Sequence, residues 1–302
     1  MDSRIKRLFI DPYYAARVVF HRLSPMIKSD EIAVRIGYFL SMHKMLNLEH
    51  PKTYNEKLQW LKLHDKRDVY TKMVDKVLAK DYVHEVLGDG YTFKTLGVWE
   101  RFDDIDFDKL PNQFVLKCTH DSGGLIICKD KSKLNIERAR KKINKCLKKN
   151  YFFATREYPY RNVVPRIIAE EYMVDESGTE LKDYKFFCFD GVPKMLFVAT
   201  DRAIDTRFDF YDSDFNHLPF TQGHPWAEKE IKKPEHFDEM LNLAARLSTG
   251  IPHVRVDLYN INGKIYFGEM TFFHYSGTMP IHPEEWDYKI GEWLKLPDDN
   301  SF

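Results

Sequence analysis

The sequence has little cysteine, and its cysteines follow no pattern of a disulfide framework or metal site. None belongs to a Cys-x-x-Cys pair: Cys118, Cys128, Cys146 and Cys188. At 302 residues the chain is long enough for about two domains with hydrophobic cores. It therefore needs no disulfides for stability, and we expect a protein of the reducing cytoplasm.

Long apolar runs and an excess of either charge are also absent. No run approaches the ~20 apolar residues of a membrane span, and the N-terminus lacks the apolar core and cleavage site of a signal peptide. Lys+Arg and Asp+Glu each number 46, so no overall field attracts nucleic acid. We expect no membrane-spanning helix and no nucleic-acid partner.

The first 67 residues are predicted to form a helical region. Apolar residues recur at helical spacing in residues 5–23 and 32–46. Residues 5–23 also carry several cations, so this helix could lie on a membrane surface. Packing of the apolar stripe on the main body is the commoner explanation, and we favour it.

The rest of the chain mixes helices and strands without a regular βαβ rhythm. Residues 68–88, 135–149 and 237–247 are predicted helices, and strands are expected from residue 91 onward. This pattern indicates an α+β fold. The helix at 135–149 has one strongly basic face, which is either a solvated surface or a docking site for a polyanionic acceptor.

The strongest chemical signal is a predicted hairpin with acidic side chains on both strands. Residues two apart along a strand share a face, so Arg255 lies beside Asp257 and Glu269 beside Thr271. Two acids and a further oxygen ligand on one face suit Mg²⁺. A cross-strand ion pair between Arg255 and Glu269 on a solvated sheet face fits the hairpin alone equally well.

The length of the turn decides whether the two acids meet. A two-residue turn at Asn262–Gly263 would send Glu269 to the face away from Asp257. A three-residue loop at residues 261–263 instead places Arg255 opposite Glu269, with Asp257 diagonal to it. We predict the three-residue loop.

A second signal is Lys117, which stands near the end of an apolar strand and precedes a loop with two glycines, residues 119–124. Such a loop can fold over a triphosphate, because glycine lets backbone N–H groups approach the oxygens. The lysine would supply a positive charge to the phosphates. Many hairpins carry similar Ser-Gly-Gly turns, however. The upstream lysines Lys76 and Lys80 are expected on a helix, where a solvated face is the simplest explanation.

Six segments, taken in order, resemble the ATP-grasp superfamily, and most closely its TupA-like branch, which is associated with teichuronopeptide and other cell-surface polysaccharide synthesis. The resemblance covers roughly residues 48–280. The segments are YNEKLQWLK, MVDKVLAKDYV, LPNQFVLKCTHDSGG, PRIIAEEYM, DYKFFCFDG and VRVDLYNINGKIYFGEMTF. The resemblance implies an α+β ATP-grasp fold in which two lobes, residues 68–169 and 170–302, clamp ATP behind an N-terminal helical region, residues 1–67.

The resemblance also implies roles for individual residues. Contacts to the phosphates of ATP fall to two lysines and four loop residues: Lys76, Lys117, His120, Ser122, Gly123 and Gly124. The hinge that reads adenine corresponds to Glu170, Glu171 and Met173. The acid that binds ribose corresponds to Asp183. Two catalytic cations are implied: Arg255, which would stabilise the transferred phosphoryl group and the acyl-phosphate, and Lys185, which would face phosphate or substrate. Mg²⁺ would be held by Asp257 and Glu269, while Thr271 stands where the family usually has asparagine.

The activity implied is an ADP-forming ligase that joins a carboxylate to an amine through an acyl-phosphate. The implied substrates are an amino acid and the uronic-acid carboxylate of a capsular or cell-wall polysaccharide, and a lipid-linked acceptor would bring the protein to the inner face of the membrane. A metal-dependent glycosyltransferase is one alternative, since Asp212–Ser213–Asp214 is a DxD motif, although these residues also fit a turn. A phosphotransferase and a non-catalytic nucleotide-binding scaffold are the others.

Overall fold

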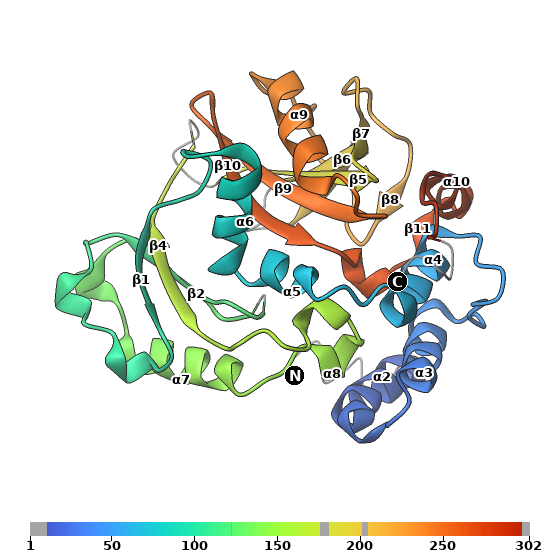
Figure 1. Cartoon of the computed structure of the whole chain (residues 1–302), viewed down its shortest axis with the longest axis horizontal. Helices are drawn as coiled ribbons and strands as arrows, with labels where there is room; N and C mark the ends of the chain where they lie inside the picture. The colour runs from blue at the N-terminus through green and yellow to red at the C-terminus, as the bar shows by residue number, and fades with distance from the viewer. Residues whose placement is uncertain (1–10, 122, 176–180, 201–204, 298–302) are drawn as a thin grey trace.

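The computed structural model describes residues 11–121, 123–175, 181–200 and 205–297 of the chain. Within these ranges the protein has two antiparallel sheets of four and five strands and a small two-stranded sheet. Figure 1 shows the two larger sheets on either side of helices α5 and α6. The predicted α+β class is confirmed.

The N-terminal part is helical, as predicted. It contains α2 (Pro12–Leu23), the short helix η1 (Ser24–Met26), α3 (Asp30–Met42) and α4 (Tyr54–His64). Helix α4 begins at a capping box, in which Thr53 and Glu56 satisfy each other's backbone N–H groups. Helix α2 packs on α3, but none of its residues is buried. Residues 5–10, the first part of the predicted amphipathic stretch 5–23, lie outside the described ranges.

The predicted helix at 68–88 is two helices, α5 (Val69–Val74) and α6 (Leu78–Leu87). The carboxylate of Asp75 accepts hydrogen bonds from the backbone N–H groups of Val77, at 2.8 Å, and Leu78, at 3.3 Å. These bonds end one helix and start the next. The expectation that Lys76 lies on a helix is therefore wrong, because Lys76 lies in the break.

The first sheet has the order β1-β4-β2-β3 and comprises β1 (Thr95–Trp99), β2 (Phe114–Cys118), β3 (Leu125–Cys128) and β4 (Ile167–Glu171). Helix α7 (Ile136–Leu147) covers one face, where its apolar side packs on alternate residues of β2 such as Leu116. Since side chains alternate along a strand, Lys117 points to the opposite face. Helix α8 (Phe152–Thr155) follows.

The second sheet has the order β10-β9-β5-β6-β7. It comprises β5 (Asp183–Phe189), β6 (Val192–Thr200), β7 (Arg207–Asp212), β9 (Val254–Ile261) and β10 (Lys264–Thr271). Helix α9 (Phe237–Ser248) packs on one face, with the rings of Phe186 and Phe237 5.9 Å apart. Lys185 and Asp257, which are paired in register, lie on the other face.

The remaining elements close the second lobe. Strands β8 (Thr221–Gln222) and β11 (Ile281–His282) form the small sheet, and α10 (Glu285–Trp293) packs on α4. No helix in the described ranges combines the length and apolarity that crossing a membrane requires. The predicted boundaries at residues 67 and 169 stay predictions.

The predicted register of the hairpin β9–β10 is wrong. The turn has two residues, Asn262 and Gly263, both with positive φ. A β-bulge at Gly268 then shifts the ladder by one residue, so that Glu269 lies directly opposite Asp257. The two acids share a face because of the bulge and not because of the turn.

Candidate nucleotide and metal site

The second sheet brings both predicted metal carboxylates and both predicted catalytic cations together. Arg255 donates to the two oxygens of Asp257, from Nε at 2.7 Å and from Nη2 at 2.8 Å. The same Nη2 lies 3.3 Å from Glu269 Oε1. Lys185 forms an ion pair with Asp257 from the neighbouring strand. Three adjacent strands therefore place four charged groups in one cluster.

Arg255 is also held by the last residue of β10 and by a histidine that follows this strand. It donates to Thr271 Oγ1 at 2.9 Å and to His274 Nδ1 at 2.7 Å. Burial and the guanidinium charge hold the pKa of His274 well below its usual range, so the ring is neutral and accepts this bond. His274 was missed in the sequence, because no residue spacing connects it to Arg255.

The first sheet supplies a second cluster of charge. Glu170 on β4 forms ion pairs with Lys117, at 2.7 Å, and Lys80, at 2.5 Å. Burial alone would raise the pKa of Glu170, but the two lysines lower it. Lys80 is thus not on a solvated face. Its spacing of four residues from Lys76 was the signal in the sequence that could have placed it beside the same site.

The two clusters meet at a narrow cavity of about 20 Å³ between the sheets. It is lined by Lys76, Lys117 and Glu170 from one side and by Gly268 and Glu269 from the other. Burial would raise the pKa of Glu269, but Lys185, Lys76, Arg255 and Lys117 together lower it to about 2. Glu269 is therefore ionised at neutral pH and lies within electrostatic reach of lysines from both lobes.

The glycine loop is built partly from bonds within itself. Gly124 N–H donates to Asp121 Oδ1 at 2.9 Å, and Lys76 Nζ donates to the Asp121 carbonyl at 2.8 Å. A side chain at Gly124 would place its Cβ 2.3 Å from Cys118 Sγ, so close packing requires glycine here. Gly123 has no such close contact, and Ser122 lies outside the described residues.

His120 is buried beneath this loop. Its Nε2 lies 3.1 Å from the carbonyl oxygen of Cys146 on α7, so the ring connects the loop to the helix behind it. The structure gives His120 a bracing contact, and its predicted contact with phosphate stays a prediction.

The predicted hinge begins with the last two residues of β4 and continues beyond the strand. Glu171 accepts from the backbone N–H of Lys94 at 2.9 Å and is anchored to the first sheet, while Met173 is half-buried beyond the strand. Asp183, at the start of β5, is buried and lies 3.2 Å from Lys185 Nζ. The adenine and ribose roles of these residues stay predictions.

One face of α4 braces the segment that follows β10. Three side chains spaced by four and three residues, Asn55, Gln59 and Lys62, donate to carbonyl oxygens of residues 276–279 at 2.7–3.2 Å. Tyr275 and Ser276 have positive φ, a strained conformation for residues other than glycine that needs such support. Helix α4 therefore fixes the position of the segment that contains His274.

Two tyrosines lie within electrostatic reach of Glu269. The rings of Tyr151 and Tyr160 are 5.0 Å apart. Glu157 and burial raise the pKa of Tyr151, and Glu269 raises it further. The two phenols are therefore protonated and can donate hydrogen bonds beside the site.

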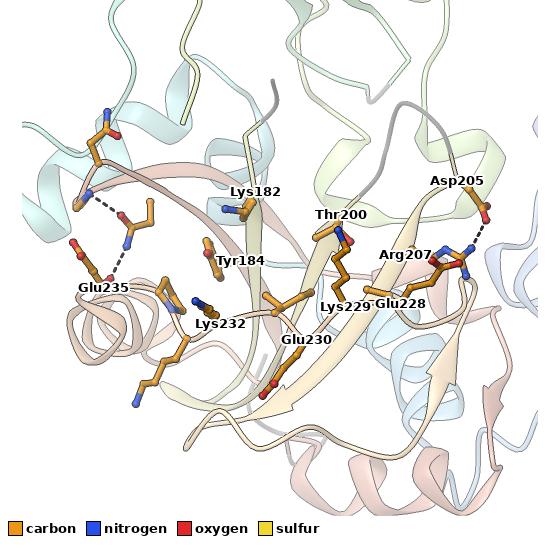
Figure 2. A pocket seen from close by; sticks show the side chains of 17 residues that line it. Lys182, Tyr184, Thr200, Asp205, Arg207, Glu228, Lys229, Glu230, Lys232 and Glu235 are labelled. Atoms are coloured by element: carbon orange, nitrogen blue, oxygen red, sulfur yellow. Dashed lines mark hydrogen bonds and ion pairs between the residues drawn. The ribbon is translucent and has the colours of Figure 1, made fainter. Parts of the chain in front are cut away.

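A larger cavity of about 1050 Å³ lies on the other face of the second sheet (Figure 2). Lys182, Tyr184 and Thr200 line it, and Figure 2 shows them beside the segment that carries Glu228 to Glu235. Tyr184 points away from its neighbour Lys185, so the sheet separates this cavity from the carboxylates.

The DxD motif forms a turn, as favoured from the sequence. Strand β7 ends at Asp212, whose Oδ1 accepts from the backbone N–H groups of Asp214 and Asn216 at 2.9 and 2.8 Å. Asp212 is committed to its own turn.

The donor set fits a magnesium ion that is shared with a phosphate chain. Asp257 and Glu269 are opposed on one face, and Glu269, whose side chain is 42% exposed, lines the cavity. Among the residues described, no three His, Cys, Asp or Glu side chains form a metal cage. Mg²⁺ commonly uses one or two carboxylates together with substrate phosphates, so the pair is sufficient.

Two sheets that direct lysines and carboxylates into one cavity define a nucleotide-binding protein of the ATP-grasp type. The family model for TupA-like ATP-grasp proteins matches residues 56–295. The chain therefore belongs to the TupA-like ATP-grasp family, and the fold and family predicted from the sequence are confirmed.

Several solved structures are similar to the chain at low identity. They include D-alanine–D-alanine ligase from Helicobacter pylori, with 12% identity over 82% of this chain and 67% of that chain, at a TM-score of 0.46. The ATP-grasp ligase PsnB with its minimal precursor has 11% identity over 79% and 66%, at 0.43. Phosphoribosylamine–glycine ligase from Thermotoga maritima has 14% identity over 67% and 48%, at 0.41.

The chain spans about two thirds or less of the length of these proteins. No curated protein sequence matches the chain.

Proposed function

We propose that the protein is an ATP-dependent, ADP-forming ligase that joins a carboxylate to an amine. The observation that carries the proposal is the shared cavity in which Lys76 and Lys117 of the first lobe face Glu269 of the second. Lysines from one side and a metal carboxylate from the other match the charge of a triphosphate and its Mg²⁺.

The proposed reaction needs no nucleophile from the protein. An oxygen of the acceptor carboxylate attacks the γ-phosphorus of ATP, the bond to the bridging oxygen breaks, and ADP leaves with that electron pair. The amine then attacks the carbonyl carbon of the acyl-phosphate. Phosphate leaves with the C–O bonding electrons, and the nitrogen loses a proton to solvent.

Individual residues have defined tasks in this scheme. Lys76 and Lys117 hold the phosphates, and Asp257 and Glu269 would hold Mg²⁺, which supplies Lewis-acid neutralisation of the phosphate charge. Arg255, fixed by its contacts on both sides, stabilises the charge of the transferred phosphoryl group. Lys185 forms an ion pair with Asp257 and would also stabilise the charge of the phosphoryl group.

For the substrates we propose an amino acid and the uronic-acid carboxylate of a capsular or cell-wall glycan. The family's association with cell-surface polysaccharide synthesis supports this choice. Tyr151 and Tyr160 support it physically, because tyrosines beside the carboxylates can stack on a sugar ring and donate hydrogen bonds. The protein would act in the cytoplasm, at the inner face of the membrane where the acceptor is lipid-linked.

The test is an ADP-release screen of uronates crossed with amino acids, with product masses read directly. We expect ADP formation that requires both substrates and Mg²⁺, and a product that has lost one water relative to them. A phosphorylated acceptor formed without any amine would identify a phosphotransferase. Absence of ADP with every pair, from protein that still binds ATP, would contradict the ligase.

A further inference from the structure

Apolar side chains are exposed where α2 continues into η1, a region called the apolar turn below. On α2 and η1, Val19 is 54% exposed, Leu23 is 50% and Met26 is 77%. Val19 and Leu23 are one helical turn apart, so they lie on the same side of α2. A surface helix normally turns its apolar side inward, yet no residue of α2 is buried. Adjacent exposed aliphatic residues of this kind mark a contact surface.

Helix α7 and the residues just after it are strongly basic, although the whole chain has no net charge. Residues 136–149 contain seven lysines and arginines and one acid. Arg140 pairs with Asp103 and Glu137. The exposed cations of this stretch for which the described residues provide no acidic partner are Arg138, Lys141, Lys142, Lys145, Lys148 and Lys149.

The apolar turn and the C-terminal end of α7 are joined by direct contacts. Helix α8 starts three residues after Lys149, and its Phe153 carbonyl accepts from Ser24 Oγ at 2.5 Å. Arg156 donates to the carbonyl of Ile27 at 2.9 Å and fixes the same turn. Phe153 is itself 40% exposed. Figure 1 shows α7, α8 and α2 along one edge of the molecule.

We propose that this edge docks on an anionic lipid bilayer. The docking surface consists of aliphatic and aromatic side chains that enter the interface and lysines that face the headgroups. Its residues are Val19, Leu23, Met26, Phe153, Lys145, Lys148 and Lys149. None of them belongs to the nucleotide site, and docking requires neither ATP nor an acceptor.

The combination of side chains selects a bilayer over a soluble polyanion. Lysines alone would suit an acidic glycan as well, since both partners carry repeated negative charge. Leu23 and Met26 would not contribute to glycan binding, because a solvated polyanion offers no apolar phase in which they could be buried. A bilayer interface accepts both kinds of side chain at once.

The experiment is co-sedimentation of the full chain with vesicles of neutral phosphatidylcholine, alone or mixed with anionic phosphatidylglycerol. We expect binding to the mixed vesicles that weakens with added salt. Each lysine near an anionic surface strengthens binding roughly fivefold. The triple variant Lys145→Gln, Lys148→Gln, Lys149→Gln should therefore bind ~100-fold more weakly.

The double variant Leu23→Ser, Met26→Ser separates the two possible partners. We expect it to lose at least ~10-fold in vesicle affinity, since two apolar side chains are removed from the interface. A matched control, Val192→Ser, changes an exposed apolar residue of the second sheet and should bind as the parent does. Thermal unfolding of each variant checks the fold.

Three results would overturn the proposal. One is absence of binding to the mixed vesicles. Another is vesicle binding that the Leu23→Ser, Met26→Ser variant retains in full. The third is stronger binding to a soluble polyuronate than to vesicles, which would assign the basic end of α7 to a glycan. Each result is independent of ligase activity, because no step uses turnover.

Discussion

At the scale of single residues, Asp257 is where the charges of the second sheet meet. Its side chain is 1% exposed, Arg255 donates to both of its oxygens, and Lys185 forms an ion pair with Oδ2. Burial raises the pKa of Asp257, while the two cations oppose this. A carboxylate enclosed in this way serves as an anchor that orders its neighbours, and its role as a metal ligand stays a prediction.

Asp257→Asn should reduce ATP turnover by roughly 10³-fold, because a metal ligand worth several kcal/mol is lost. The double variant Asp212→Asn, Asp214→Asn is the control, since those residues form only a surface turn. It should stay within about twofold of the parent in ADP release, because surface changes away from the site have small effects. Loss of activity in the control with retention in Asp257→Asn would favour the glycosyltransferase.

Glu269 predicts a dependence of stability on pH. Its pKa is about 2 in the folded protein, below its ordinary 4.5, so its stabilising effect is complete above pH 4.5 and is lost as the pH falls toward 2. Because 42% of the side chain is exposed, solvent screens the lysines, and we expect only about 1 kcal/mol. Urea unfolding should show Glu269→Gln less stable than the parent at pH 7, with the gap narrowing at pH 3.5.

At the scale of elements, the bulge in β10 decides whether the site exists. The two-residue turn alone would place Gly268 opposite Asp257 and turn Glu269 away. One extra residue at Gly268 corrects the register just before the acid is needed. The turn therefore fixes where the hairpin reverses, and the bulge places Glu269 opposite Asp257.

Gly268→Ala should lower both stability and activity. Its Cβ would lie 3.0 Å from the backbone oxygen of Asp257 and from the Tyr259 ring. We expect a loss of about 1–3 kcal/mol in the free energy of unfolding, with slower ADP release because Asp257 must move.

Gly123→Ala is the matched control for Gly268→Ala, because its Cβ would meet nothing closer than 3.5 Å. Equal stability losses in the two variants would show that the bulge is not under tight packing.

At the scale of the whole molecule, the proposed nucleotide site draws on both large sheets. Lys117 stands on the first sheet and Glu269 on the second, and α5 and α6 lie between the sheets (Figure 1). A bound triphosphate would bridge the two sheets. Binding should therefore stabilise the chain as a unit.

ATP with Mg²⁺ at about 100 times its Kd should stabilise the folded protein by ~2.7 kcal/mol and raise Tm by several degrees. Lys117→Met should lose most of this shift while keeping its unliganded Tm within a few degrees, since only one ion pair at the cavity is removed. Lys194→Met removes an exposed lysine of β6 as the control. A full shift in Lys117→Met would show that Lys117 does not contact the nucleotide.

The strands that carry the site were predictable because their pattern is local. Alternation of buried and polar residues identified β9 and β10, and with them the shared faces of Arg255, Asp257 and Glu269. The residue opposite Glu269 was not predictable, because the bulge at Gly268 depends on contacts between the two strands. Lys80 was taken for a solvated residue because its partner, Glu170, lies ninety residues away in the chain.

The sequence by itself determined the fold class, the family and the chemical identity of the charged groups, since each rests on residue order and on periodicity along one segment. Only the tertiary structure decided that Lys117 and Glu269 face one cavity, that His274 holds Arg255, and that an apolar turn lies beside a basic helix end. Those relations join residues far apart in the chain, and packing between separate elements sets their distances.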